Sequence, residues 1–551
     1  MKEDYSILIG GAAGQGSRRA GFIIARLLSH YGYETFIYDD YQSLIRGGHN
    51  FSKIRAASEK VLSHRKKIDF LLAFNEETVE KHKQNLDKNG LIIYDKDKFE
   101  VKDKKAVGIA TKEIIDQTKG KPIMSNTAFV AGFAKNIGIN WQTLKNLLKE
   151  EFEKYEAMNL KIAKLAFEKA DQQTQIEKIG QKKDQPLLTG NQALSLGAVK
   201  AGLDFYIAYP MTPSTGILHY LAQRKHDFNI GVAQLENEIG VISSAIGAAY
   251  TGARTMIGTS GGGFALMTES FSLAAMNETP LVIVESQRMS PASGVPTYNA
   301  QADLLFTANS GHGDILRFII APGDADEACF WGGQILNLSW QFQTPSILLI
   351  DKEISESTFT FDKKVLDKIK KEKPKLWSKK GKYLRYKETK DGISPLAFPG
   401  EKNQVIKANS YEHQENGLTT EEPGPIKDMQ NKRLRKFEAM KKEVNKLPAV
   451  KVYGDKKAKK ALIAWGSTKG PALEAAEKLG LKLIQPIILQ PFPEKQMKQA
   501  LKGVQKVYLA ETNATAQLGR ILKGYNIKVD KQILKYDARP FIAEEIINKV
   551  K

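Results

Sequence analysis

The chain has 551 residues, a formal net charge of +20, and a composition that is 42% hydrophobic and 26% charged. This length predicts roughly three to four domains, and the composition is typical of a soluble globular protein. No apolar run is long enough to span a bilayer and the start Met1-Lys2-Glu3-Asp4-Tyr5 is not a signal peptide, so we expect a cytoplasmic protein without a membrane partner.

Cysteine and lysine usage narrow the function further. Cys329 is the only cysteine, which excludes an internal disulfide framework and an iron–sulfur cluster held by cysteines of this chain alone. Lysines gather at residues 363–382 and 456–460. Such runs are usually solvated faces, but they also attract phosphate-bearing ligands, acidic proteins or nucleic acid. No RNA-binding signature or zinc-finger spacing supports nucleic acid.

The chain opens with an apolar strand that enters a glycine-rich turn, Gly10-Gly11-Ala12-Ala13-Gly14-Gln15-Gly16. Residues 17–29 then carry helical apolar spacing. Glycines before a helix let backbone N–H groups approach an anion, so Gly14 and Gly16 are candidate cofactor-binding residues. The spacing is neither a clean dinucleotide fingerprint nor a P-loop, because no Gly-Lys-Ser/Thr follows.

Further strands are expected at residues 33–38, 71–75 and 90–94, each followed by a polar or helical segment. This alternation predicts parallel βαβ units. The polar stretch 172–183 is typical of a linker, so we expect a first α/β domain at residues 1–180.

A second α/β domain is expected at residues 188–355. Its near-continuous apolar runs suit a parallel sheet that is covered on both faces. A helix should open at Gly190, and a glycine loop at residues 260–263 should precede a helix over 264–277. The expected strands are 205–208, 255–259, 280–285 and 345–350.

Strand 205–208 runs directly into Tyr209-Pro210-Met211-Thr212-Pro213. The two prolines force the chain out of the sheet and hold Thr212 in a stiff turn. Open α/β sheets place ligands at this end of a strand. A rigid turn without chemistry fits the pattern equally well.

Two carboxylates, Glu236 and Glu238, lie at the start of a helix predicted over residues 237–250. Glu238 shares the apolar face of this helix, whereas Glu236 aligns with the polar side. A carboxylate on an apolar face is costly unless it has a partner, which favours Glu238 as the functional acid. An acid stabilised by the helix dipole is the alternative.

Arg288 follows strand 280–285, where an arginine is well placed to hold a substrate carboxylate with two hydrogen bonds. An ordinary surface arginine is the alternative.

The rest of the chain divides into two parts. Residues 356–450 are charged and carry little periodicity, and we expect a connecting segment with few core elements. Residues 451–551 predict a compact C-terminal α/β domain. Its expected strands are 461–465, 482–488 and 506–510, and its expected helix is 471–479.

Several separated motifs resemble those of 2-oxoacid:ferredoxin oxidoreductases. Tyr209–Ser214 resembles the Tyr-Pro-(Ile/Met)-Thr-Pro-Ser signature, and Glu238-Ile239-Gly240 resembles a Glu-Ile-Gly pattern of this family. In the N-terminal region Ala13–Gly16 departs by one residue from Gly-Gly-Gln-Gly, and Arg46-Gly47-Gly48 resembles an Arg-Gly-Gly loop.

Motifs of the second half resemble the same family. Those in residues 294–314 resemble the 2-oxoglutarate branch. At the C-terminus, Ala538 replaces the glycine of the usual Asp-Gly-Arg-Pro-Phe ending. The quoted stretches are Gly294-Val295-Pro296-Thr297, Gln301-Ala302-Asp303-Leu304, Gly311-His312-Gly313-Asp314, His413–Gly417, Glu511-Thr512-Asn513 with Gln517-Leu518, and Asp537–Phe541.

The resemblance implies a fused gamma–alpha subunit that decarboxylates a 2-oxoacid, with thiamine diphosphate, coenzyme A and ferredoxin. The implied domains are a gamma-type domain, a pyrimidine-binding domain at 188–355 and a transketolase C-terminal-like domain at 451–551. Glu238 would bind the aminopyrimidine ring of the cofactor, Thr212 and Arg288 would contact the substrate, and Thr297 would line the same pocket. The gamma-type domain is linked to coenzyme A in relatives.

The resemblance also implies partners. The chain lacks the Gly-Asp-Gly…Asn pattern that positions magnesium and diphosphate, so these, together with a [4Fe-4S] cluster, would belong to a separate beta subunit. A dimer of alpha–beta pairs is expected, and the resemblance implies no metal-binding residue in this chain. Two other classes stay open: a coenzyme A- or dinucleotide-binding module, and a non-catalytic assembly paralogue.

Overall fold

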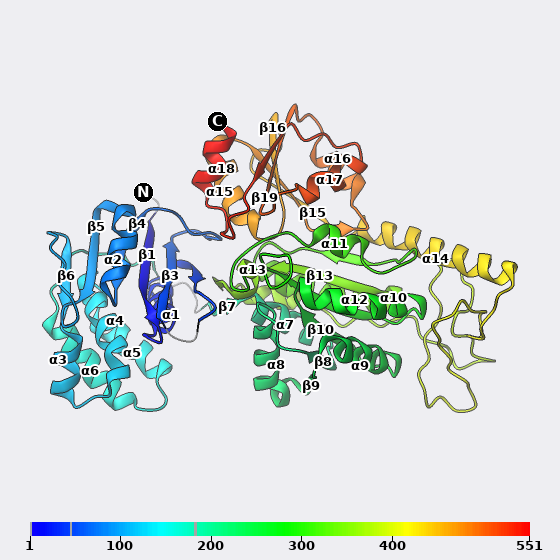
Figure 1. Cartoon of the computed structure of the whole chain (residues 1–551), viewed down its shortest axis with the longest axis horizontal. Helices are drawn as coiled ribbons and strands as arrows, with labels where there is room; N and C mark the ends of the chain where they lie inside the picture. The colour runs from blue at the N-terminus through cyan, green and yellow to red at the C-terminus, as the bar shows by residue number, and fades with distance from the viewer. Residues whose placement is uncertain (1–2, 45–46, 181–184) are drawn as a thin grey trace. The chain divides into compact units, whose positions relative to one another are not determined.

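The computed structural model describes residues 3–44, 47–180 and 185–551, which form two compact units. Unit 1 comprises Met1–Leu188 and Ser357–Asp362, and unit 2 comprises Thr189–Glu356 and Lys363–Lys551. Both are α/β structures built on sheets with parallel strands, as predicted (Figure 1). No helix of the described ranges has both the length and the apolarity that crossing a membrane requires.

Unit 1 is built on an eight-stranded sheet of order β6-β5-β4-β1-β3-β2-β14-β7. Its strands are β1 (Asp4–Ala13), β2 (Glu34–Asp40), β3 (Gly47–Ala57), β4 (Ile68–Ala73), β5 (Leu86–Asp95), β6 (Ala106–Ile109), β7 (Leu187–Thr189) and β14 (Thr358–Thr360). Its helices are α1 (Ser17–His30), α2 (Glu76–His82), α3 (Thr111–Thr118), α4 (Ser125–Asn136), α5 (Trp141–Glu151) and α6 (Glu156–Lys169), with short 3-10 turns η1 (Lys83–Asn85) and η2 (Pro122–Met124).

Alternate residues of β1 face opposite sides of this sheet. Ile7 and Ile9 belong to the large core formed with the helices, whereas Leu8 belongs to a smaller cluster that includes Val79 of α2. Both faces of the sheet are therefore covered, which explains the apolar run at residues 7–9.

The strands predicted in unit 1 correspond to β1, β2, β4 and β5 and run in one direction, but an antiparallel strand that was not predicted, β3, lies between β1 and β2. Strands β1, β4, β5 and β6 are parallel neighbours, but β3 runs antiparallel to both β1 and β2. The connection from β2 to β3 is too short for a helical crossover. Strand β3 does not match a regular apolar pattern, because polar residues such as His49, Ser52 and Arg55 interrupt it.

Unit 2 contains a seven-stranded sheet of order β18-β12-β13-β11-β10-β8-β9, parallel except for β18. Its strands are β8 (Phe205–Ala208), β9 (Gly231–Gln234), β10 (Thr255–Thr259), β11 (Leu281–Gln287), β12 (Phe318–Ile320), β13 (Pro345–Asp351) and β18 (Ile488–Gln490). The associated helices are α7 (Gly190–Lys200), α8 (Thr215–Phe228), α9 (Glu238–Tyr250), α10 (Gly261–Met276), α11 (Leu304–Asn309), α12 (Ala325–Phe342) and α13 (Lys352–Glu356).

The predicted glycine loop at residues 260–263 is the first turn of a helix instead. Ser260 is the N-cap residue, and Gly261, Gly262 and Gly263 open α10. Because glycine has a low helix propensity, the predicted start of this helix lies three residues after the observed one. Tertiary packing overrides that preference here.

The C-terminal lobe, residues 450–551, has a five-stranded sheet of order β15-β17-β16-β19-β20. Its core is continuous with the core on one face of the seven-stranded sheet, and β18 pairs with β12. Its elements are β15 (Val450–Tyr453), β16 (Lys460–Ala464), η4 (Gly466–Thr468), α15 (Lys469–Leu479), β17 (Lys482–Pro486), α16 (Glu494–Ala500), β19 (Lys506–Glu511), α17 (Gln517–Gly524), β20 (Lys531–Leu534) and α18 (Ala543–Val550).

Gln301 bonds the second domain to the C-terminal lobe. Its side-chain amide donates to Trp465 O at 2.7 Å, and its carbonyl oxygen accepts from Thr468 Oγ1 at 2.9 Å and from Thr512 N at 3.1 Å. The Asn513 side chain donates to Gln301 O at 3.0 Å. Two motifs that are distant in sequence, at 301–304 and 511–513, are therefore in direct contact.

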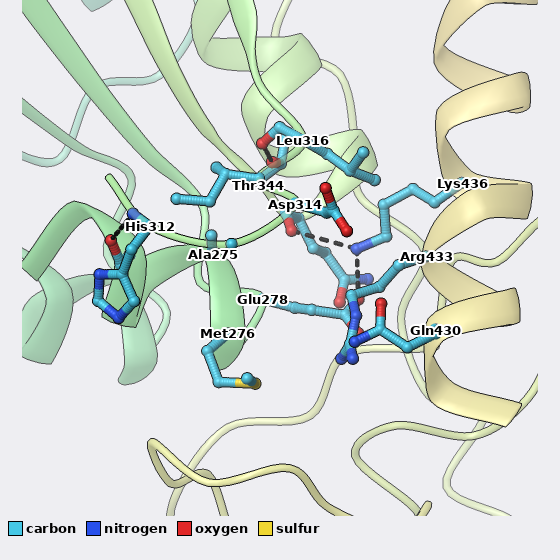
Figure 2. A pocket seen from close by; sticks show the side chains of 14 residues that line it. Ala275, Met276, Glu278, His312, Asp314, Leu316, Thr344, Gln430, Arg433 and Lys436 are labelled. Atoms are coloured by element: carbon cyan, nitrogen blue, oxygen red, sulfur yellow. Dashed lines mark hydrogen bonds and ion pairs between the residues drawn. The ribbon is translucent and has the colours of Figure 1, made fainter. Parts of the chain in front are cut away.

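The connecting segment contains one long helix that the sequence analysis did not predict, α14 (Pro423–Val444), and also the short turn η3 (Lys363–Lys368). The buried stripe of α14 contains Lys432 and Lys436 at positions where a helix usually carries apolar residues. Both lysines reach the buried carboxylate of Glu278, and the Lys432–Glu278 distance is 2.6 Å. Figure 2 shows the contact of Lys436 with Glu278. The ion pairs hold the pKa of Glu278 well below its usual value despite its burial.

Candidate active site

The turn that follows β8 is held by hydrogen bonds to its own carbonyl groups. The Ser214 hydroxyl donates to Met211 O at 2.7 Å, and the buried Asn191 side chain of α7 donates to Pro213 O at 2.9 Å. These bonds explain why the turn is rigid. They leave the half-buried side chain of Thr212 at the carboxyl end of β8.

Arg288 directly contacts this turn. Its Nη1 donates to the carbonyl oxygen of Thr212 at 2.8 Å. A guanidinium group has five N–H donors, so this bond fixes the side chain and leaves donors for another acceptor. Thr212 and Arg288, which are 76 residues apart in sequence, are therefore brought together.

Glu238 is the first residue of α9 and is only 5% exposed. Asn237 caps the helix by accepting a hydrogen bond from Gly240 N at 2.9 Å. Glu236 precedes the cap and is exposed. The predicted division between a buried Glu238 and a solvent-facing Glu236 is confirmed.

The Glu238 carboxyl lies against the start of α10. A Cβ atom added at Gly263 would lie 2.8 Å from Glu238 Oε1 and would also overlap with the Thr259 hydroxyl. A side chain at position 263 would thus displace Glu238. Within the described chain, no hydrogen bond or ion pair engages this carboxyl, so it is available to a ligand.

The order of strands places these residues at one edge of the sheet. Strands β9, β8, β10 and β11 are consecutive parallel neighbours. Glu238, Thr212, Gly261 and Arg288 follow their respective carboxyl ends. This edge is where open α/β sheets bind ligands.

Two buried acids that the sequence analysis did not place in the site lie beside Arg288. Glu285 of β11 is fully buried, and none of the described groups donates a hydrogen bond to either of its oxygens. Asp303 precedes α11 and is fixed by a hydrogen bond of 3.0 Å from its backbone N–H to Gln287 Oε1. Its Oδ2 lies over Gly261, 2.6 Å from where a Cβ would be.

Burial dominates the electrostatics of this acid pair. Burial and the charge of Asp303 raise the pKa of Glu285 well above its ordinary value, and burial raises the pKa of Asp303 to about 6. A protonated Glu285 can donate a hydrogen bond to Asp303, as in other pairs of facing carboxyls. Burial lowers the pKa of Arg288, and the two acids oppose that shift.

Asp303 also lines a cavity of about 600 Å³ at this edge. Its walls come from the start of α10, the loops at 289–292 and 300–303, and residues 512–517 and 536 of the C-terminal lobe. The volume suits a small organic ligand. The 511–513 motif thus contributes to the wall of a cavity beside the predicted site.

Thr297 is not joined to the other predicted site residues by a hydrogen bond in the described part of the chain. It is 5% exposed, and its hydroxyl has no hydrogen-bond partner there. The Thr297 side chain is therefore buried and polar, but its place in a substrate pocket stays a prediction.

The glycine turn of unit 1 has the geometry that the sequence predicts. Strand β1 ends at Ala13 and α1 begins at Ser17, with Gly16 as the N-cap. Gly14 and Gly16 have φ angles of 92° and 79°, a region that glycine adopts without strain. A Cβ at Gly14 would meet nothing within 4 Å, so this side of the turn is open. Arg46 of the Arg-Gly-Gly motif lies outside the described residues.

Comparisons with known proteins agree with this architecture. The family model described as "Pyruvate flavodoxin/ferredoxin oxidoreductase, thiamine diP-bdg" matches residues 196–431, and "Pyruvate ferredoxin/flavodoxin oxidoreductase" matches residues 6–169. The 2-oxoacid:ferredoxin oxidoreductase subunit alpha of a Sulfolobus species is 30% identical over 98% of this chain and 95% of its own length. The chain belongs to this family of alpha subunits.

Two further relatives refine the position of this 2-oxoacid:ferredoxin oxidoreductase subunit. The 2-oxoglutarate synthase subunit KorA of Archaeoglobus fulgidus is 29% identical over 61% of this chain and 89% of its own. A solved structure of 2-oxoglutarate:ferredoxin oxidoreductase from Magnetococcus marinus, with 2-oxoglutarate, coenzyme A and succinyl-CoA bound, is 29% identical. It superposes with a TM-score of 0.91 and covers 100% of this chain and 99% of its own. The predicted family, fold class and enzyme class are confirmed.

Proposed function

We propose that this alpha subunit forms one wall of a thiamine diphosphate site in which a 2-oxoacid is oxidatively decarboxylated to an acyl-coenzyme A. The observation that carries the proposal is the buried carboxyl of Glu238, which no group in the described ranges pairs with, at the same sheet edge as the Thr212–Arg288 contact. The thiamine diphosphate-binding description of the matching family model supports it.

The residues at this edge fit the aminopyrimidine half of the cofactor. Glu238 offers a carboxyl that has no hydrogen-bond or ion-pair partner among the described residues, and Gly263 leaves the space beside it open. When bound, thiamine diphosphate supplies the carbanion chemistry that a 2-oxoacid decarboxylation needs. Glu238 would hold the ring by a hydrogen bond and exchange a proton with it, and burial would strengthen that bond.

Thr212 and Arg288 would hold the substrate. The Arg288 guanidinium has donors left after its bond to Thr212 O, and a planar fork of N–H groups matches a carboxylate. The bond to Thr212 O fixes the guanidinium before substrate arrives, which lowers the cost of binding. Thr297 would complete the pocket.

The substrate we propose is 2-oxoglutarate. The relatives from Archaeoglobus and Magnetococcus carry 2-oxoglutarate in their names, and the motifs at 294–314 resemble the same branch. The glycine turn at Gly14 and Gly16 would contribute to binding coenzyme A, which is bound in the Magnetococcus structure.

The chain needs partners for the complete reaction. The name "subunit alpha" of its relatives implies a complex of several subunits, and this chain has one cysteine, which is buried. A beta subunit would supply the diphosphate and magnesium site and a [4Fe-4S] cluster, and ferredoxin would accept the electrons. We infer a dimer of alpha–beta pairs.

A Glu238→Gln substitution tests the catalytic role directly. The amide keeps the size of the side chain but cannot exchange a proton, so we expect turnover by the assembled complex to fall at least 100-fold. The measurement is 2-oxoglutarate-dependent ferredoxin reduction, with thiamine diphosphate binding followed by fluorescence quenching.

Glu236→Gln is the matched control, because it makes the same change two residues away on an exposed side chain. It should retain activity within twofold. An inactive Glu236→Gln variant together with an active Glu238→Gln variant would contradict the assignment of Glu238 as the catalytic acid.

A further inference from the structure

The C-terminal lobe contains a cavity of about 850 Å³ that the proposed function does not use, lined by β15, β17, α16 and the end of α14. Its charged lining residues are four lysines, Lys456, Lys482, Lys495 and Lys502, and no carboxylate lines it. It shares no lining residue with the cavity beside Asp303. A hollow that gathers only positive charge favours an anionic occupant.

Lys482 is the most informative of these lysines, because its side chain is buried. It is 3% exposed, and its ammonium donates one hydrogen bond, to Ala500 O at 3.1 Å. An ammonium has three donors, and no carboxylate pairs with this one within the described chain. A buried charge without a counter-ion is costly, and an anion in the cavity would offset that cost.

Nearby carboxylates do not neutralise the cavity. Glu494 of α16 pairs with Lys498 at 2.5 Å, and Glu443 of α14 pairs with Lys446 at 2.6 Å. Neither of these lysines lines the cavity. The exposed lysines that do line it, at 456, 495 and 502, form no ion pair in the part of the chain that the structure describes.

The remaining lining is suited to an organic body rather than to a bare ion. Val450, Val452 and Ala500 provide an apolar surface, and Asn445 and Gln499 provide amides. Drug-sized ligands occupy cavities of about 300–1,000 Å³ with such mixed walls. The buried Lys482 is reached only by a group that enters the cavity, which disfavours a flat protein surface as the occupant.

We propose that this cavity binds a nucleotide-sized organic polyanion, with its phosphates on the four lysines and its uncharged body against Val450 and Val452. The site is separate from the catalytic edge and does not depend on the proposed function. Nucleoside triphosphates and coenzyme A share this chemistry. The probes must therefore distinguish binding through the phosphates from binding through the uncharged part of the ligand.

The test uses the full chain and four probes: ATP, coenzyme A, inorganic tripolyphosphate and adenosine. Calorimetry gives the affinity, and protection of individual lysines from acetylation, read by mass spectrometry, gives the location. We expect ATP or coenzyme A to protect the three exposed cavity lysines, Lys456, Lys495 and Lys502. Tripolyphosphate should bind at least fivefold more weakly than that ligand, and adenosine should protect none of the three. Raising the salt concentration should weaken the binding.

The triple variant Lys456→Gln, Lys495→Gln, Lys502→Gln should weaken this binding at least tenfold. Its matched control is Lys457→Gln, Lys459→Gln, Lys523→Gln, which changes three exposed lysines of the same lobe outside the cavity and should leave the affinity unchanged. All six side chains are exposed, so both variants should fold.

Three results would overturn the proposal. The first is that neither ATP nor coenzyme A protects the three exposed lysines at millimolar concentration. The second is a triple variant that binds ATP or coenzyme A with the same affinity as the wild type. The third is equal affinity for tripolyphosphate and the organic ligands, which would remove the role of Val450 and Val452. If only an acidic protein protects these lysines, neither ATP nor coenzyme A does, and the proposal is overturned as well.

Discussion

The position of the Glu238 carboxyl at the proposed catalytic edge depends on the absence of a side chain at Gly263. Gly263 lies in the first turn of α10, where an alanine would favour the helix by up to about 1 kcal/mol. The same alanine would overlap with Glu238 Oε1 and the Thr259 hydroxyl. Helix propensity therefore favours alanine at position 263, whereas the position of Glu238 requires glycine there.

We expect Gly263→Ala to lower turnover at least tenfold, because it displaces Glu238. Gly262→Ala is the matched control, since the nearest atom to its Cβ would be Ala292 O at 3.8 Å. It should keep wild-type activity and gain a little stability. The measurements are steady-state kinetics and thermal unfolding, and equal kinetics for the two variants would remove Gly263 from the site.

The raised pKa of Asp303 leads to a second prediction at the scale of a residue, that the free energy of unfolding depends on pH. Asp303 has a folded pKa of about 6 against an ordinary value of 3.8. Because the fold raises this pKa, the stability from the protonated acid is complete below pH 3.8 and is lost as pH rises to about 6. The difference amounts to about 3 kcal/mol.

Asp303→Asn should remove this loss, because an amide resembles the protonated acid and does not ionise. Wild type and variant should have similar unfolding free energies near pH 4, and the variant should be more stable by up to about 3 kcal/mol at pH 7. Urea unfolding at several pH values measures this. Two stability curves that stay parallel across the range would refute the raised pKa.

At the scale of elements, regular patterns predicted regular structure. Strands β8 and β10 match their predicted bounds, and α9 begins within one residue of its prediction. Most of their buried residues are apolar, so local pattern and tertiary burial agree. Elements whose core positions carry charge escaped prediction: β3 with Arg55 and α14 with Lys432 and Lys436.

The candidate site shows the same division. Glu238 was predicted because the helix period separates it from Glu236. The pairing of Glu285 with Asp303 was not predicted, because it depends on how a loop returns over α10. The placement of Glu285 in an apolar strand was a usable signal, since a carboxylate there needs a partner.

The ion pairs of α14 lead to a stability prediction for this element. Glu278→Gln would leave Lys432 and Lys436 buried without a carboxylate, at a cost of about 3–5 kcal/mol. Glu443→Gln, whose partner Lys446 is exposed, should cost less than about 1 kcal/mol. Chemical unfolding of the full chain tests both, and equal losses would contradict the role of the buried carboxylate.

At the scale of the whole molecule, the chain carries the sheet edge at which we propose catalysis, but it has only one cysteine. If the diphosphate site and the cluster lie on a beta subunit, the isolated chain should show no 2-oxoglutarate-dependent ferredoxin reduction. Adding the beta subunit should restore it. Turnover by the isolated chain, purified to homogeneity, would falsify the division of the site between two subunits.

Gln301 has a consequence for anyone who recombines such subunits. A chimera cut at residue 450, where the composition changes, would retain Gln301 from one parent and take Trp465, Thr468 and Thr512 from the other. The interchangeable part of this enzyme is therefore not a continuous stretch of chain. A graft of the C-terminal lobe has to carry the short segment around Gln301 with it.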